Sequence, residues 1–306
     1  SNTIFFADSL SSFDPLTGQG KLKWIRHEAF SAHNFNNSMQ SYKRSFSNEF
    51  PATEYQQDPV LPFSVEFVGP GTVRIRARTS NEKVGEEESL MLVKKPELDP
   101  SWKYTKIKGG HQYVGSMGSV TILESPWKII VKDSQGKILT QTRSKEDGKI
   151  SYTPTLPFSF VRRASDYSRS VAAIFSISPD EKIFGCGESF TKLDKNGQKV
   201  VLWTHDPNGV ETQTMYKPIP FYMSSRGYGM FMHTSSPITC DFGATYGESN
   251  AIQIGDQNLD LFVFLGKPQE ILNAYTDLTG KPSMPPLWSF GLWMSRITYS
   301  CRCNPF

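Results

Sequence analysis

The stretch FSVEFVGPGTVRIRART, from Phe63 to Thr79, carries the clearest sign of the fold. It holds two runs of alternating apolar and polar residues around Gly69-Pro70-Gly71, which is the pattern of a β-hairpin. The stretches WKIIVKDSQGKILTQT (127–142) and PFYMSSRGYGMFMHT (220–234) repeat this design around their own glycine-containing turns. Many short strands with Gly and Pro turns predict an all-β protein, a sandwich of antiparallel sheets.

Composition narrows the class of protein. Hydrophobic residues make up 38% and charged residues 21% of 306 residues, which suits a globular protein with a sizeable core. The net charge of +3 comes from scattered basic residues, so we expect no nucleic acid partner. No apolar run reaches the roughly 18 residues of a membrane span, so we expect no membrane partner. The sequence does not decide between a cytoplasmic and a periplasmic location. It also does not decide whether the protein forms a homo-oligomer.

The four cysteines and five histidines show no metal-binding spacing and no disulfide framework. Cys301 and Cys303 have one residue between them, which is a poor zinc signal without further ligands. We therefore expect no metal and no cofactor.

The two ends of the chain differ from its middle. Residues 1–60 are polar and aromatic without a clear period, and we expect long loops and short strands there. One helix is predicted over 267–280, with Pro268 in its first turn, Gly280 at its end, and an apolar face of Ile271, Leu272, Tyr275 and Leu278.

The stretch LWSFGLWM (287–294) follows a proline-rich linker and is apolar on both faces, as strands of a parallel sheet are. It reads as the first strand of a new core. The sequence therefore predicts a β-sandwich domain over 1–282, and a linker with the first strand of a second domain over 283–306.

Two short stretches could carry chemistry. In FGCGESF, Gly185 and Gly187 allow a tight backbone path that places Glu188, and we favour a structural sheet corner. In VVLWTHDPNG, His205 and Asp206 end a strand before a turn. Asp206 is either a ligand contact on a loop or a cap of the turn. No pair of carboxylates stands out by spacing, so no complete catalytic apparatus is visible.

Four segments, taken in order, resemble glycoside hydrolase family 31 and especially its bacterial α-xylosidase branch. They are FGCGESFTKLDKNGQKVVLWTHD (184–206), YKPIPFYMSSRGYGMFMHT (216–234), AYTDLTGKPSMPP (274–286) and LWSFGLWMSR (287–296). The resemblance implies a galactose-mutarotase-like supersandwich followed by a (β/α)8 barrel. It implies retaining hydrolysis of α-glycosidic bonds at the non-reducing end by two barrel aspartates, without a metal or organic cofactor.

The resemblance also assigns roles to individual residues. It implies that Asp206 contacts the sugar in the −1 subsite and that Phe290, on the first barrel strand, lines the sugar pocket. Trp293 lies close to that position and is a third candidate for substrate binding. Glu188 matches a family hallmark that we interpret as architectural. The partner implied is an α-linked oligosaccharide in the full-length enzyme.

The final residues depart from the family pattern. SCRCNPF (300–306) shows no helical period where the first barrel helix would begin, and no counterpart of either catalytic aspartate is present. We therefore expect a truncated barrel, a least ordered segment at 300–306, and a chain that is inactive as cut. Two alternatives stay open: a stand-alone carbohydrate-binding or assembly module, and the same family with α-glucosidase or another α-glycosidase specificity.

Overall fold

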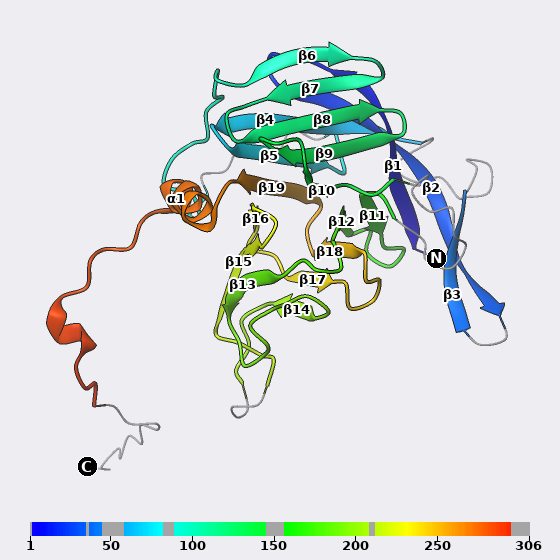
Figure 1. Ribbon diagram of the computed structural model, residues 1–306. Coiled ribbons are helices and arrows are strands. Elements are labelled where there is room, and N and C mark those ends of the chain that lie inside the picture. The colour runs from blue at the N-terminus through cyan, green and yellow to red at the C-terminus, as the bar shows by residue number, and fades with distance from the viewer. Residues whose placement is uncertain are drawn as a thin grey trace, which may run out of the picture.

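A computed structural model describes residues 2–34, 37–44, 58–81, 89–144, 156–207 and 212–294 of the chain. In these residues the strands form two sheets, of fourteen and five strands, and every ladder between neighbouring strands is antiparallel. The predicted all-β sandwich is confirmed. Figure 1 shows the smaller sheet as a layer over β4 and β5 of the larger one.

The strands of the smaller sheet are neighbours in sequence order, whereas those of the larger sheet are not. The smaller sheet runs β10 (Ile138–Gln141), β9 (Trp127–Asp133), β8 (Gly118–Glu124), β7 (Gly110–Val114) and β6 (Lys103–Ile107). The larger sheet runs β13 (Ile183–Glu188), β15 (Lys217–Ser224), β16 (Tyr228–Met232), β19 (Asn258–Leu265), β5 (Thr72–Arg78), β4 (Val60–Gly69), β2 (Gln19–Asn34), β1 (Thr3–Phe13), β11 (Ser159–Arg162), β12 (Arg169–Ser176), β18 (Ser249–Ile254), β17 (Ile238–Phe242) and β14 (Lys199–Leu202), with β3 (Asn37–Arg44) beside β2.

The predicted hairpins form as the alternation indicated. In the hairpin of β4 and β5, Val65 lies opposite Ile75, and both side chains are buried. The stretches at 127–142 and 220–234 give the hairpins β9–β10 and β15–β16. Aromatic contacts join the two layers: the ring of Phe63 on β4 meets that of Trp127 on β9 at 5.5 Å between centroids. The period-2 pattern therefore located the strands but not all the faces that they bury, because all five residues of β16 are buried.

The N-terminal segment differs from our expectation of loops and short strands. β1 and β2 are 11 and 16 residues long and lie within the large sheet. Their pairing contains two register shifts, between Ala7 and Ser9 and between Leu10 and Ser12. Such bulges break the alternation of apolar and polar residues, which explains why the sequence pattern hid these strands.

The predicted helix is present as α1 (Pro268–Thr279), the α-helix of the described residues. Glu270 accepts a hydrogen bond from the Lys267 backbone N–H at 2.7 Å and so caps its start. Ile271 and Leu278 are buried against the large sheet, whereas Leu272 is 42% exposed. Leu272 is therefore not part of the buried face.

The predicted barrel strand at 287–294 is not a strand in this structure. Leu287–Phe290 forms a short 3₁₀ helix, η3, and residues 291–294 have no regular structure. Figure 1 shows this segment extending away from the sheets beyond α1. A strand that is apolar on both faces needs neighbouring strands to pair with, and the described residues supply none at this position. The expectation for 300–306 lies outside the described residues.

The large sheet curves so that its two ends approach each other. β13 begins the strand order and β14 ends it, yet β14 contacts β15, the neighbour of β13. Figure 1 shows β13 and β14 side by side at the end of the molecule away from the smaller sheet. This meeting place holds the residues that the sequence singled out.

Candidate functional site

Asp206 lies on a loop that leaves the end of β14. The loop is held by an isolated parallel bridge between Thr204 and Met215, and the His205 N–H donates to the Met215 carbonyl at 3.1 Å. The Asp206 side chain is exposed, and no hydrogen bond to it is found among the described residues. Its carboxylate is therefore open to a ligand in the described part of the loop, and the alternative role as a cap of the turn falls on residues 208–211, which lie outside the described residues.

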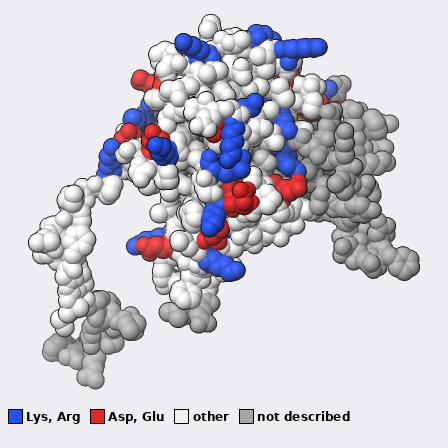
Figure 2. Space-filling view, viewed as in Figure 1, with Lys and Arg blue, Asp and Glu red and all other residues white. Residues whose placement is uncertain are grey.

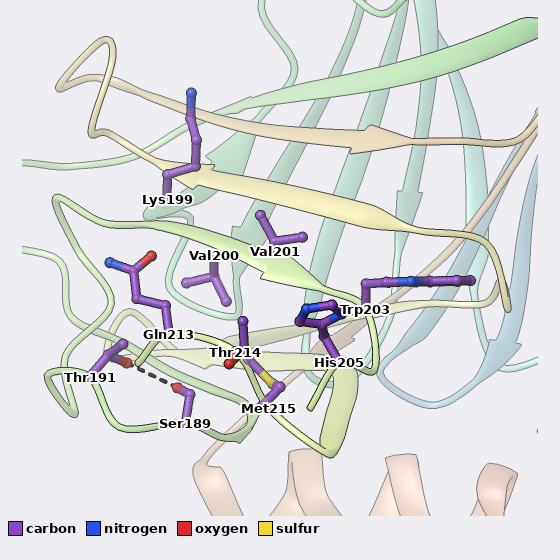
Figure 3. A pocket seen from close by; sticks show the side chains of 10 residues that line it. All are labelled: Ser189, Thr191, Lys199, Val200, Val201, Trp203, His205, Gln213, Thr214 and Met215. Atoms are coloured by element: carbon purple, nitrogen blue, oxygen red, sulfur yellow. Dashed lines mark hydrogen bonds between the residues drawn. The ribbon is translucent and has the colours of Figure 1, made fainter. Parts of the chain in front are cut away.

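A hollow of about 390 Å³ opens beside this loop (Figure 3). Its walls come from β14, from the segment after β13 and from the segment before β15. Figure 3 shows Trp203 and His205 at one end, Ser189, Thr191 and Gln213 at the other, and Thr214 and Met215 between them. This volume lies within the range of roughly 300–1,000 Å³ that is usual for small-ligand sites.

Sequence reasoning missed most of this hollow. It named His205 and Asp206 but gave no role to Trp203 or Gln213. The alternation of β14 contained part of the signal, because Lys199 and Val201 face outward while Val200 and Leu202 are buried. Trp203 and His205 continue this outward face.

Phe290 and Trp293 lie apart from Asp206 and the hollow. Both side chains are on the segment beyond α1, and they are 73% and 68% exposed. The Trp293 indole N–H donates to the Ser289 carbonyl at 2.7 Å, and its ring lies 5.9 Å from that of Trp288. Figure 1 shows that this segment does not reach the β14 loop. The structure therefore does not assemble the three predicted substrate-binding residues into one site.

The glycine-rich stretch forms a sheet corner, as we favoured. Gly185, Cys186 and Gly187 all have positive φ, at 131°, 70° and 89°, where β13 slips its register against β15. A Cβ on Gly187 would lie 2.1 Å from the Lys217 carbonyl oxygen, so the position requires glycine. The exposed Glu188 carboxylate lies 3.8 Å from the Lys217 ammonium, which gives it a surface ion pair.

Buried polar groups behind the corner are neutral or paired. Cys186 and Cys240 are free and buried, and their mutual hydrogen bond together with burial raises the pKa of the Cys240 thiol. The Glu181 carboxylate accepts hydrogen bonds from Ser224 and Tyr228, each at 2.6 Å. These contacts stabilise the sheet corner, and we assign these groups a structural role rather than a catalytic one.

Charges on the face seen in Figure 2 are mixed, with Lys and Arg interspersed among Asp and Glu. Within the described ranges, no three His, Cys, Asp or Glu side chains gather closely enough to hold a metal ion. Among the same residues, no helix has both the length and the apolar character needed to cross a membrane.

Comparison with known proteins identifies the family. Residues 62–241 match the glycosyl hydrolase 31 N-terminal galactose mutarotase-like domain. The chain therefore belongs to glycoside hydrolase family 31, whose members hydrolyse O-glycosyl bonds, and carries its N-terminal domain.

Two similar curated relatives are α-xylosidases. Alpha-xylosidase XylQ of Lactiplantibacillus pentosus is 37% identical over 163 residues, which are 53% of this chain and 20% of the relative. An alpha-xylosidase of Emericella nidulans is 40% identical over 124 residues, 40% of this chain and 16% of the relative. These matches thus span a fifth or less of each relative.

A solved structure shares the fold at lower identity. The cycloalternan-forming enzyme of Listeria monocytogenes, in complex with a pentasaccharide substrate, has a TM-score of 0.69 and 19% identity. The likeness covers 96% of this chain and 24% of that enzyme. It supports the architecture of the sandwich.

Proposed function

We propose that this chain is the N-terminal portion of a retaining α-glycoside hydrolase of the α-xylosidase type, acting on α-linked sugars at the non-reducing end. The observation that carries the proposal is the identity of 37% and 40% with two α-xylosidases. The family membership makes hydrolysis of a glycosidic bond the expected reaction. The α-xylosidase type is the finer part of the proposal, and α-glucosidase specificity is its alternative.

We propose a domain boundary near residue 282. Residues 1–282 would form the sandwich domain, and 283–306 would supply the linker and the first strand of a (β/α)8 barrel. The exposed apolar side chains of η3 and of residues 291–294 support this division, because they have no packing partner within the described part of the sandwich. In the complete enzyme, neighbouring barrel strands would cover them.

In the proposed enzyme, Asp206 reaches from the β14 loop to the sugar bound at the barrel. A carboxylate accepts short, charge-assisted hydrogen bonds from sugar hydroxyls. Its exposure in this structure supports the assignment. Phe290 and Trp293 would line the same sugar pocket once barrel neighbours hold residues 287–294 as a strand.

The test of this role uses this chain extended by the catalytic barrel of the proposed full-length enzyme. We expect Asp206→Asn to lower kcat/KM for p-nitrophenyl α-xyloside by about 10- to 150-fold, the equivalent of one hydrogen bond to a charged group. Asp166→Asn, which changes an exposed turn carboxylate, is the matched control. An unchanged kcat/KM in the Asp206 variant would remove Asp206 from the sugar site.

The same assay addresses the activity of the chain alone and its specificity. We propose that the 306-residue chain has no turnover, because no counterpart of the two catalytic aspartates is present in it. Turnover by the purified chain would contradict this proposal. A higher kcat/KM for the α-glucoside than for the α-xyloside, measured on the extended protein, would favour the α-glucosidase alternative.

A further inference from the structure

The hollow beside β14 has the chemistry of a binding site for an uncharged ligand. Among the described residues that line it, none is acidic. Lys199, the one cation among them, directs its ammonium away from the other labelled side chains in Figure 3 and lies 3.4 Å from the Asp241 carboxylate. The described part of the lining therefore offers no free charge to a ligand.

Polar and aromatic groups combine inside this hollow. The side chains of His205 and Gln213 line it, and no hydrogen bond to either is found within the described residues. Together they can donate to and accept from hydroxyl groups. Trp203 is 51% exposed and provides a large apolar ring beside His205, whereas Gln213 lies at the other end of the hollow (Figure 3). An apolar face bordered by hydrogen-bonding groups fits a sugar ring, which has apolar C–H faces and a rim of hydroxyls.

The hollow is separate from the position of Asp206. Trp203 and His205 continue the outward-facing side of β14, whereas Asp206 is not among the residues that line the hollow. One loop thus presents two different contact positions, an anionic one and a neutral aromatic one.

We infer that this hollow is an accessory carbohydrate subsite for a neutral sugar, with one pyranoside unit against Trp203 and His205 and the hydroxyls of a further unit at Gln213. The inference rests on the proposed function for its class of ligand. It does not require a barrel, because the described residues that line the hollow all lie between Ser189 and Met215. The 306-residue chain alone should therefore bind sugar without turning it over.

The test measures binding of isoprimeverose and maltose to the 306-residue chain by saturation-transfer difference NMR and calorimetry. We expect saturable binding, which Trp203→Ala weakens about tenfold or more through loss of the aromatic contact. Trp203→Phe keeps a ring and should retain most of the affinity, while Gln213→Ala should weaken binding without touching the ring. Trp288→Ala is the matched control, since Trp288 is an exposed tryptophan outside the hollow.

Each outcome decides between clear alternatives. No saturable binding by the unaltered chain overturns the inference, as does equal binding by the Trp203→Ala variant when its thermal unfolding is unchanged. Loss of binding in Asp206→Asn with Trp203→Ala unaffected would place the sugar at the loop carboxylate and also overturns it. These results are independent of the kinetic test of Asp206 in the extended enzyme, so the two proposals can fail separately.

Discussion

Asp260 joins three elements through side-chain hydrogen bonds. Its two carboxylate oxygens accept from Arg74 at 2.9 and 2.6 Å, and one of them lies 2.7 Å from His233 Nδ1. The other ring nitrogen of His233 lies 2.6 Å from Ser89 Oγ. The order Ser–His–Asp matches that of a hydrolytic triad. However, Ser89 Oγ accepts a hydrogen bond from the Met91 N–H, and none of the three residues lines the hollow, so we assign them to structure.

The stability contributed by Asp260 should depend on pH. Burial alone would raise the pKa of its carboxyl, but hydrogen bonds and charges from Arg74 and His233 outweigh this and hold the pKa below its usual value. A lowered pKa in the folded state stabilises the fold above the unfolded pKa of about 3.9, and this stability is lost as pH falls through the folded pKa.

We expect Asp260→Asn to lower the free energy of unfolding by about 3 kcal/mol or more at pH 7, as for a broken buried ion pair. The difference in the free energy of unfolding between this variant and the unaltered chain should become smaller below pH 4. Urea denaturation between pH 3 and 7 measures both. Glu188→Gln, which breaks an exposed ion pair, should change stability little. If the difference in unfolding free energy between the two proteins stays constant down to pH 3, ionisation of Asp260 does not contribute to stability.

Gly187 offers a second test at a single residue. Alanine there would have a positive φ and a Cβ 2.1 Å from a backbone carbonyl oxygen, whereas Gly197 has a similar φ of 78° with no atom within 4 Å. We expect Gly197→Ala to cost about 1–2 kcal/mol for the backbone conformation alone, and Gly187→Ala clearly more. Chemical denaturation compares the two. Equal costs would mean that the corner yields to the added methyl group.

The helix α1 packs on the outside of the large sheet. The ring of Tyr275 stacks on that of Phe221 at 4.1 Å, and Ile271 and Leu278 complete a small core separate from the main one. This second core lies immediately before the proposed domain boundary. It therefore fixes the direction in which the chain leaves the sandwich.

Neighbouring residues of α1 should respond differently to substitution. Ile271 is 1% exposed and Leu272 is 42% exposed. We expect Ile271→Ala to reduce the free energy of unfolding by about 2–5 kcal/mol, and Leu272→Ala by about 0.5 kcal/mol or less. Thermal and urea unfolding provide the measurement. A large effect at Leu272 would mean that another surface covers it in solution.

The elements that the sequence predicted are those that local patterns define. The hairpin at 63–79 and the helix at 267–280 carry their own period and turn or cap residues, and both formed. β1 and β2 escaped notice because bulges interrupt their alternation. The stretch at 287–294 carries the pattern of a buried barrel strand but is not a strand here, since apolar content on both faces signals burial only when neighbours exist; its role as the first barrel strand stays a prediction. The hollow escaped because the Thr204–Met215 bridge brings the segment before β15 beside the end of β14, which no local period encodes.

For the molecule as a whole, the sandwich and the segment beyond α1 have opposite characters. The sandwich buries one continuous aromatic and aliphatic core. The segment from Met284 to Met294 exposes seven large apolar side chains, between 68% and 92% in each case. Figure 2 shows this segment as a white, uncharged arm. Such exposure favours association with other apolar surfaces.

Shortening the chain to residues 1–282 should therefore leave the sandwich intact. We expect its thermal midpoint to stay within about 2 °C of that of the full chain, because little packing is lost. We also expect less self-association at high concentration. Differential scanning fluorimetry and light scattering after gel filtration test both. A loss of cooperative unfolding in the shortened chain would show that the segment packs on the sandwich.

The approach of β13 to β14 also bears on how the chain folds. These strands stand at opposite ends of the sheet order, yet only the residues between Glu188 and Lys199 separate them along the chain. Bringing them together closes a short loop, and short flexible loops lose little entropy on closure. Contact between the two ends of the sheet therefore adds little to the entropy cost of folding, whereas β14 itself depends on its pairing with the later strand β17.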